Sequence, residues 1–235
     1  MSMLEKVLDV LSPWGITCPL CGEDSGGDVL CAVCAEQLRE LRLSALPCPE
    51  CGEEMENGSF CPHCGSGVRI VSAFGHSGPA RHLVHMLKFD ASRMAGEQLA
   101  QAMTACCPPD LSADAVLTWV PMPKRRQLER GIDHARVLCE YAAAQLGIPC
   151  RQLLSRVDEK DTKLQREMDR EERLTQKTRF RAGESMPEKV ILVDDVITTG
   201  ATMRECRELL LKAGCKEVAL MSATRTVRRG KEEDM

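Results

Sequence analysis

The sequence predicts an α/β protein in which a parallel sheet flanked by helices follows a small N-terminal metal-binding module. Two observations lead to this fold class. After residue 67, short apolar runs typical of buried strands alternate with segments of helical periodicity, which is the pattern of parallel α/β sheets. Before that point lie four Cys-x-x-Cys pairs. We therefore expect two domains, with residues 1–67 forming the metal module and residues 68–235 forming the α/β domain.

The composition is that of an ordinary soluble protein. The 235 residues carry a net charge of −4, with 43% apolar and 28% charged residues, and this length allows one or two domains with a sizeable core. No apolar run approaches the length of a membrane span, and residues 3–11 show the spacing of a short amphipathic helix, not of a signal peptide. We expect a cytoplasmic protein with no membrane insertion.

The cysteines of the Cys-x-x-Cys pairs form an internal repeat, because each cysteine of the first two pairs recurs 30 positions later. Four thiolates make a closed tetrahedral zinc site with a structural role, so we expect two structural zinc ions. Sequential pairing would give two zinc ribbons and interleaved pairing a cross-brace; the equal spacing favours ribbons, with His63 as a bystander. The expected ligands are Cys18, Cys21, Cys31, Cys34, Cys48, Cys51, Cys61 and Cys64.

The metal module is acidic, since residues 1–70 hold four basic residues against eleven acidic ones. All-thiolate zinc sites add further negative charge, and a surface of this sign repels phosphate. The module is therefore expected to dock a protein or to have a purely structural role. Positive charge concentrates in the second domain, where an anionic substrate would need it.

The secondary structure of the α/β domain follows from apolar periodicity and from the residues that begin and end helices. The stretch at 158–180 is polar and charged, so it is either disordered or a functional lid. The expected elements, in chain order, are a strand at 68–74, helices at 79–88 and 97–105, a strand at 115–120, a helix at 135–146 closed by Gly147, a strand at 190–193, and a helix beginning near Met203 with Gly214 after its end.

The stretch V-I-L-V-D-D-V-I-T-T-G-A-T-M at 190–203 carries the strongest functional signal. Asp194 and Asp195 follow the apolar run, and ligands of open α/β sheets bind beyond the carboxyl ends of the strands. The two carboxylates can accept hydrogen bonds from the vicinal hydroxyls of a ribose, while a small-residue loop entering a helix suits a phosphate. We interpret the stretch as a 5-phosphoribosyl site; the alternative is an ordinary strand–turn–helix. The loop consists of Thr198, Thr199, Gly200, Ala201 and Thr202.

A second anion site is expected after the strand at 115–120. The proline-fixed sequence Val120-Pro121-Met122-Pro123 leads into a basic cluster and then into the helix at 135–146. The alternative is a basic surface turn. The candidate ligand-binding residues of this loop are Met122, Pro123, Lys124 and Arg125.

Residues 190–202 resemble the phosphoribosyl pyrophosphate (PRPP) motif of type I phosphoribosyltransferases. The resemblance implies a phosphoribosyltransferase-like sheet in which Asp194 and Asp195 hold the ribose hydroxyls and 198–202 hold the 5-phosphate. It also implies that the loop at 120–126 binds pyrophosphate, and that 158–180 closes over PRPP.

The whole chain resembles the ComF family, which joins a double Cys-x-x-Cys zinc region to a phosphoribosyltransferase domain. The family is associated with DNA uptake in natural competence, near a DNA-translocating helicase. Its Arg-Gly-Phe-Asn-Gln element stands here as Arg-Gly-Ile-Asp-His at 130–134. Besides the four cysteine pairs, the matching features are Leu87-Lys88, the prolines at 120–123, Arg130-Gly131, Gln165 with Arg173, and residues 190–202.

Two classes of function are compatible with this resemblance. In the first, the protein transfers the 5-phosphoribosyl group of PRPP with loss of pyrophosphate, using Mg²⁺, with Lys88 as a ligand-binding residue and Asp194, Asp195, Arg173 and Gln165 as the catalytic set. In the second, it is a non-catalytic nucleotide sensor or an accessory protein that handles single-stranded DNA. Aromatic residues make up only 3% of the chain, which weakens a stacking platform for single strands. Release of pyrophosphate from PRPP separates the two classes.

Overall fold

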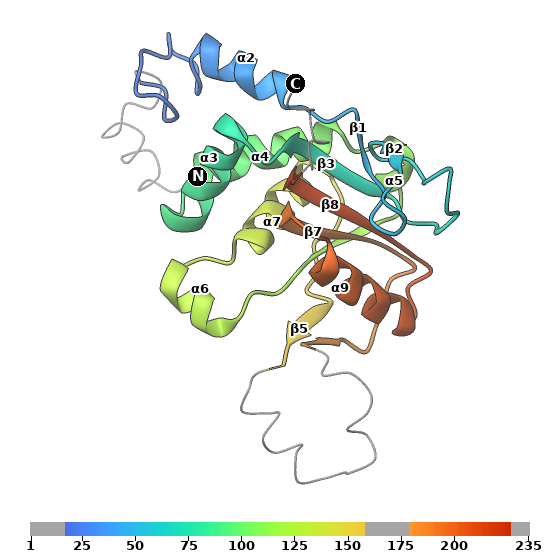
Figure 1. The fold of residues 1–235 in the computed structure, drawn as a ribbon. Helices are drawn as coiled ribbons and strands as arrows, with labels where there is room; N and C mark the ends of the chain where they lie inside the picture. The colour runs from blue at the N-terminus through green and yellow to red at the C-terminus, as the bar shows by residue number, and fades with distance from the viewer. Residues whose placement is uncertain (1–16, 158–178, 227–235) are drawn as a thin grey trace, which may run out of the picture.

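A computed structural model describes residues 17–157 and 179–226. Its centre is a four-stranded parallel sheet with the strand order β3-β8-β7-β4 (Figure 1). The expected helix at 3–11 lies outside the described residues, as do Gln165 and Arg173 in the expected lid. The strands of the sheet are β3 (Ile70–Gly75), β4 (Val116–Trp119), β7 (Lys189–Ile197) and β8 (Glu217–Arg225).

Strand β7 is buried on both faces, as its continuous apolar run predicts. Val190 and Leu192 belong to one hydrophobic cluster, while Ile191 and Val193 belong to another, because side chains alternate along a strand. The strand is longer than predicted: its pairing with β8 continues to Ile197. Asp194 and Asp195 therefore lie among the last residues of β7 that pair with β8, and not beyond the end of the strand.

Helices cover both faces of the sheet (Figure 1). Residues of α3 (Gly78–Phe89), α4 (Arg93–Ala105) and α7 (His134–Leu146) form the first hydrophobic cluster, and residues of α9 (Ala201–Lys212) belong to the second. An antiparallel ribbon, β5 (Leu154–Arg156) with β6 (Phe180–Ala182), lies on the α9 side. The ribbon was not predicted, because strands of three residues carry too little periodicity.

The predicted helices are present with shifted ends. Helix α4 begins a turn earlier than expected, where the Ser92 side chain accepts a hydrogen bond from the Ala95 amide at 3.3 Å and caps the helix. Helix α7 ends at Gly147, whose φ of 68° is left-handed, as predicted. Two short helices, α5 (Pro109–Ser112) and α6 (Lys124–Arg130), were not predicted. No helix within the described ranges is long and apolar enough to cross a membrane.

The two halves of the cysteine repeat pack against opposite faces of the sheet. Cys18, Cys31 and Cys34, with the helix α2 (Ala32–Glu40), join the cluster of α3 and α4. Cys48 and Cys61 join the cluster of α9. The second half also contains the hairpin of β1 (Ala45–Pro47) and β2 (Glu54–Glu56). The cysteine-rich segment is therefore built into both cores of the α/β fold.

Candidate phosphoribosyl site and metal centres

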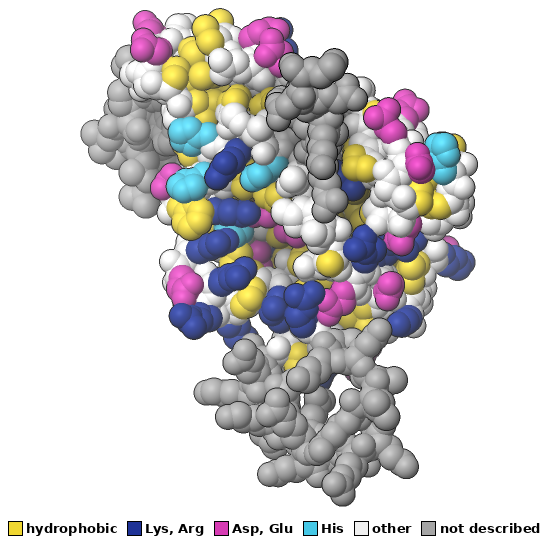
Figure 2. Space-filling model, in the orientation of Figure 1, with side chains coloured by type: hydrophobic (Ala, Val, Ile, Leu, Met, Phe, Trp, Pro, Cys, Tyr) yellow, Lys and Arg dark blue, Asp and Glu magenta, His cyan; other side chains and the backbone are white. Residues whose placement is uncertain are grey.

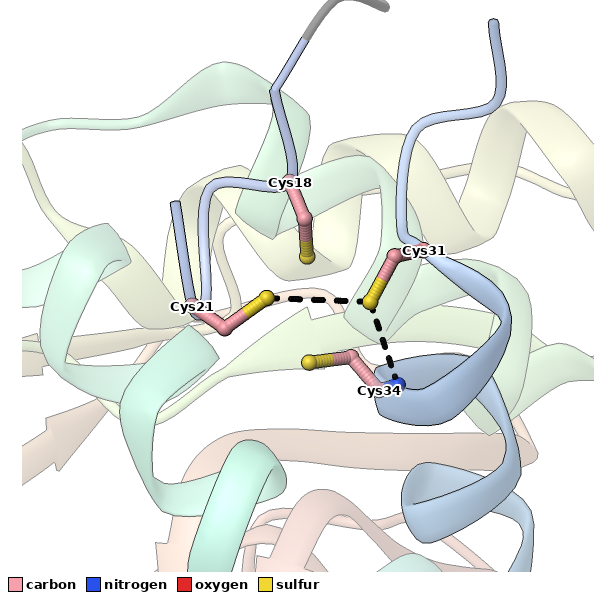
Figure 3. Close-up of side chains that lie close together, drawn as sticks. All are labelled: Cys18, Cys21, Cys31 and Cys34. Atoms are coloured by element: carbon pink, nitrogen blue, oxygen red, sulfur yellow. Dashed lines mark hydrogen bonds between the residues drawn. The ribbon is translucent and has the colours of Figure 1, made fainter. Parts of the chain in front are cut away.

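The eight repeat cysteines form two tetrads in sequential order. Cys18, Cys21, Cys31 and Cys34 form the first tetrad, and Cys48, Cys51, Cys61 and Cys64 form the second, with the sulfur atoms of each within 4.8 Å of one another. Figure 3 shows the side chains of the first tetrad turned toward a common centre. This arrangement confirms the ribbon pairing and excludes the cross-brace; His63 belongs to neither tetrad.

The tetrads fit zinc. Zn–S bonds of about 2.3 Å in a tetrahedron place neighbouring sulfurs about 3.8 Å apart. The Cys21–Cys31 sulfurs lie 3.6 Å apart, the Cys51–Cys61 sulfurs also 3.6 Å, and the Cys48–Cys64 sulfurs 3.7 Å. Four cysteines with no open position make a structural site, so these residues hold two structural zinc ions.

The repeat extends to the backbone of the knuckles. The amide of Gly22 donates to the Cys18 carbonyl at 2.8 Å, and the amide of Gly52 donates to the Cys48 carbonyl at 3.0 Å. Both glycines are left-handed, with φ of 79° and 81°, a conformation that a residue with Cβ adopts at a cost. The glycines that follow Cys21 and Cys51 thus allow the tight turns around the metal.

A cavity of about 350 Å³ opens at the carboxyl ends of β4 and β7. Figure 2 shows Lys and Arg side chains gathered around a hollow on the face drawn. This position is where open α/β sheets bind ligands. The cavity is lined by Lys88, Val120, Pro121, Met122, Pro123, Arg126, Arg130, Asp133, His134, Ala135, Arg156, Arg179, Asp194, Asp195 and Thr202.

The acidic pair lies at the floor of this cavity. Asp195 is 7% exposed, and its Oδ2 lies 2.8 Å from Nζ of Lys88 and 3.4 Å from Nδ1 of His134. Asp194 turns the other way, and its Oδ1 accepts a hydrogen bond from the Asp195 amide at 2.9 Å. Lys88 reaches Asp195 from the last turn of α3, so two helices and a strand fix one carboxylate.

The two carboxyls differ in acidity. Burial, followed by the charge of Asp195, raises the pKa of Asp194 well above its usual range. Burial also acts to raise the pKa of Asp195, but hydrogen bonds from His134 and Lys88 outweigh it, and the net effect lowers the pKa. Neighbouring buried carboxyls repel each other when both are ionised. Asp195 is therefore the ionised member, and Asp194 is the member that tends to hold a proton.

His134 is a site residue that the sequence reasoning did not select. It is 2% exposed and lies between Asp195 and Arg130, whose Nη1 is 3.1 Å from His134 Nε2. The Arg130 guanidinium in turn lies 5.1 Å from the centroid of the Phe89 ring. Asp133, the residue before His134, caps α7 by accepting a hydrogen bond from the Arg136 amide at 3.4 Å. Burial raises the pKa of Asp133. The place of His134, three residues after Gly131, was the available signal.

Three guanidinium groups that line the cavity lie near one another. Arg126 comes from α6, while Arg156 and Arg179 come from β5 and the residue before β6. Burial, followed by the charges of Arg179 and Arg126, lowers the pKa of Arg156. Glu205 on α9 pairs with Arg179, whose Nε lies 3.0 Å from Glu205 Oε2, and the positive charge that remains favours a bound anion. Sequence patterns did not indicate Arg156 or Arg179, because the ribbon that carries them was not predicted.

The loop at 198–202 follows β7 at the mouth of the cavity. Thr202 lines the cavity, whereas Thr198, Thr199 and Ala201 are exposed. Gly200 precedes α9 with a left-handed φ of 74°, and the Thr199 hydroxyl accepts from the Ala201 amide at 3.4 Å. The first amides of an α-helix have no partner within the helix. The start of α9 thus presents donors beside the acidic pair.

The proline-containing loop at 120–123 lines the cavity through Met122 and Pro123. Lys124 and Arg125 lie outside the lining residues, and the Nε of Arg125 is 2.8 Å from Oε1 of Glu129 on the surface of α6. A helix directs neighbouring side chains to different sides. For this reason Arg126 faces the cavity and Arg125 does not.

Residues 135–235 match the phosphoribosyl transferase domain, and residues 7–65 match the double zinc ribbon domain. Over 230 residues the chain is 31% identical to the DNA utilization protein YhgH of Salmonella typhimurium, and the match covers 92% of this chain and 93% of that protein. The chain belongs to the ComF family.

Shorter matches support the ComF assignment. The Competence protein ComFC of Streptococcus pneumoniae is 30% identical over 108 residues, which cover 45% of this chain and 46% of that protein. The Competence protein F of Haemophilus influenzae is 36% identical over 112 residues, covering 45% of this chain and 48% of that protein. In this ComF chain the zinc-ribbon match spans both tetrads, and the transferase match spans the acidic pair and the loop at 198–202.

Proposed function

We propose that this ComF-family protein binds PRPP in the cavity and transfers its 5-phosphoribosyl group. The observation that carries the proposal is the acidic pair at the carboxyl end of β7, placed directly before a small-residue loop and a helix N-terminus in a cavity rich in arginine. The chemistry of PRPP is complementary to this site. Its ribose hydroxyls can donate to the two carboxylates, and the phosphate groups on either side of the ribose can accept from amides and guanidinium groups.

The ribose hydroxyls would donate to Asp194 and Asp195. Asp195 is already oriented by Lys88 and His134, so it is preorganised to accept a hydrogen bond. The 5-phosphate would lie at the start of α9, where the hydroxyl of Thr202 and the first helix amides converge. The loop residues Thr198 and Thr199 would close around the phosphate as additional donors.

The pyrophosphate of PRPP would lie toward the loop at 120–123 and the guanidinium of Arg126. Magnesium fits this arrangement, because it favours carboxylate and phosphate oxygens and retains water ligands. Asp194 and Asp195, through the ribose hydroxyls or directly, are the residues that would hold it. Bound there, Mg²⁺ would neutralise charge on the leaving pyrophosphate.

The chain's contribution to the reaction is mainly position and electrostatics. Breaking the bond between C1 and pyrophosphate leaves positive charge on the ribose ring, which the ionised Asp195 would stabilise at short range. Arg126 and Arg130 would stabilise the departing pyrophosphate. His134 is already engaged by Asp195 and Arg130, so we assign it the role of holding Asp195 in place and not of activating an acceptor.

The names of the relatives indicate a biological setting in DNA use and natural competence, and we propose that this chain works there. Single-stranded DNA and a competence helicase remain its proposed partners, and the cytoplasm its proposed location. A second candidate is a sensor that binds PRPP or a nucleotide without turnover. The engagement of His134 on both ring nitrogens favours this candidate, because it leaves that imidazole unavailable as a base.

Two assays on the zinc-loaded protein test these proposals. Thermal unfolding with and without PRPP and Mg²⁺ tests binding, since a ligand at 100 times its Kd stabilises a protein by about 2.7 kcal/mol. Pyrophosphate release with free nucleobases or single-stranded DNA as acceptors tests turnover. A melting-temperature shift with pyrophosphate release supports the transferase, and a shift without release supports the sensor. No shift at millimolar PRPP would contradict both.

A further inference from the structure

Six cysteines lie outside the tetrads, and two of them are in contact. The Sγ atoms of Cys139 and Cys150 are 3.1 Å apart, and both thiols are free. A disulfide has an S–S length of about 2.05 Å, so the two sulfurs need to approach by only about 1 Å more to form one. Neither cysteine belongs to a group of three or more potential metal ligands among the described residues. A metal therefore does not account for this contact.

The backbone holds both cysteines in place. Cys139 lies on the buried face of α7 and is 0% exposed. Cys150 forms a parallel bridge with Leu117 of β4, which is an edge strand of the sheet. Two hydrogen bonds fix this bridge: the Leu117 amide donates to the Pro149 carbonyl at 2.8 Å, and the Leu117 carbonyl accepts from the Arg151 amide at 2.9 Å. The two sulfurs thus meet between a helix and a sheet edge that are each held by their own hydrogen bonds.

The two thiols differ in acidity and in access to solvent. The hydrogen bond with Cys139 lowers the pKa of Cys150 against the opposing effects of burial and of the Glu140 charge, and the Arg136 charge lowers it further. The same hydrogen bond, followed by burial, raises the pKa of Cys139. Cys150 is partly exposed, whereas Cys139 is buried. Because the thiolate is the reactive form of cysteine, Cys150 is the nucleophile of the pair and Cys139 is the thiol that keeps its proton.

The other four cysteines outside the tetrads provide a contrast. Burial raises the pKa of Cys107 to about 11 and that of Cys206 to about 12. It also raises the pKa of Cys106 and of Cys215. Of the six cysteines outside the tetrads, all of which the structure describes, Cys150 is thus the one with a lowered pKa. Acidity and contact with a second sulfur therefore coincide at Cys150.

We propose that Cys139 and Cys150 form a redox site, in which a hydroperoxide oxidises the two thiols to a disulfide that joins α7 to the edge of the sheet. Neither cysteine lines the phosphoribosyl cavity. The disulfide nevertheless connects two segments that supply cavity residues, because α7 begins with His134 and the chain after Cys150 runs into β5, which carries Arg156. Oxidation fixes these two segments relative to each other from behind the cavity.

The oxidation balances in two steps. The Cys150 thiolate attacks one oxygen of the hydroperoxide; the S–O bond forms, the O–O bond breaks, and the leaving oxygen takes up a proton, so that Cys150 becomes a sulfenic acid. The Cys139 sulfur then attacks the Cys150 sulfur; the S–S bond forms, the S–O bond breaks, and the hydroxyl leaves with the Cys139 proton as water. The two thiols lose two electrons and two protons to the peroxide, and a low-molecular-weight thiol restores them by exchange.

The test exposes the full-length, zinc-loaded protein to hydrogen peroxide and locates the oxidised cysteines. Samples are quenched at intervals with N-ethylmaleimide in denaturant and digested without reduction, and mass spectrometry identifies the linked peptides. The peptide joining Cys139 to Cys150 should form at least about tenfold faster than any other disulfide, because its sulfurs are already in contact. Dithiothreitol should return both cysteines to the thiol form.

Two variants test the roles of the two thiols. Cys139→Ser removes the thiol that attacks second, so Cys150 should remain a sulfenic acid that dimedone labels. Cys106→Ser is the matched control, because Cys106 is also partly exposed but has a raised pKa; this variant should form the Cys139–Cys150 disulfide at the parent rate.

The parent protein alone can overturn the proposal, so the decision does not depend on whether a variant folds. If millimolar peroxide produces no disulfide between Cys139 and Cys150, or if Cys150 pairs with a different cysteine, the redox site does not exist. Absence of a dimedone adduct on Cys150 in a folded, peroxide-treated Cys139→Ser protein would overturn the assignment of Cys150 as the nucleophile.

Discussion

Replacing each member of the acidic pair by asparagine should have opposite effects on stability. Asp195 is the ionised partner of Lys88 and His134, so Asp195→Asn removes the charge that both neighbours contact. Asp194 is half-buried, and desolvation, followed by the charge of Asp195, raises its pKa. Asp194→Asn replaces a carboxyl whose ionised form is unfavourable by a neutral group of the same size, and it removes the repulsion between the two carboxylates.

The magnitudes follow from these contacts. A hydrogen bond to a charged group contributes about 1.5–3 kcal/mol, and in a protein of this size about 1 kcal/mol corresponds to roughly 2–4 °C in Tm. Because Lys88 keeps 21% of its side chain exposed, water compensates part of its loss. We expect Asp195→Asn to lower the Tm by about 3–8 °C, and Asp194→Asn to leave it unchanged or raise it.

The pH dependence sharpens the comparison. Asp195 has a lowered folded pKa, so its contribution to the free energy of unfolding is present above the unfolded value of about 4 and is lost as pH falls through the folded pKa. Asp194 has a raised folded pKa, so its contribution is present below about 4 and is lost as pH rises toward the folded pKa. Above about pH 4, Asp195→Asn should therefore be less stable than the parent by a nearly constant amount, whereas Asp194→Asn should gain stability relative to the parent as pH rises.

Differential scanning calorimetry of the three zinc-loaded proteins between pH 4 and pH 8 measures both curves. The deficit of Asp195→Asn should already be present at the acidic end and stay nearly constant, whereas Asp194→Asn should start near the parent and gain stability toward neutrality. A loss of stability in Asp194→Asn equal to that in Asp195→Asn would refute the assignment of the ionised and protonated members.

Three further predictions concern the cavity and the metals. Arg126→Met should weaken PRPP binding about tenfold in calorimetry, whereas Arg125→Met, its neighbour outside the cavity, should not; equal effects would remove Arg126 from the site. Gly200→Ala should cost about 1 kcal/mol in thermal unfolding, because φ is 74° while the added Cβ meets nothing closer than 3.8 Å; an unchanged Tm would contradict the left-handed turn. Metal analysis should find two zinc ions per chain, and Cys48→Ser should lose one of them; a Cys48→Ser protein that retains both would exclude Cys48 as a ligand.

The parts of the fold that were predicted correctly carry strong local signals. The strand at 190–193, the helix ending at Gly147 and the tetrads all follow from periodicity, a left-handed glycine or fixed cysteine spacing. The ribbon pairing of the tetrads followed from equal spacing alone, which is a local property of the chain.

The parts that were missed depend on tertiary contacts. His134 reaches Asp195 because α7 begins beside β7, and no sequence spacing encodes that approach. Arg156 and Arg179 enter the cavity through a ribbon whose two strands are only three residues each. Strand β7 extends beyond its apolar run because the backbone of β8 continues to pair with it as far as Arg225. The acidic pair of the site could therefore be predicted from the sequence, whereas most of its positive side chains are brought there by tertiary packing and could not.

The most direct test of the central claim is isothermal titration calorimetry of PRPP with Mg²⁺ into the zinc-loaded protein. The geometry of the cavity predicts saturable binding of one PRPP per chain, with competition from both ribose 5-phosphate and pyrophosphate, and affinity about 10- to 100-fold lower in Asp195→Asn, which removes the ionised carboxylate. PRPP binding that is undiminished in Asp195→Asn and insensitive to both competitors would contradict a phosphoribosyl site at the end of β7.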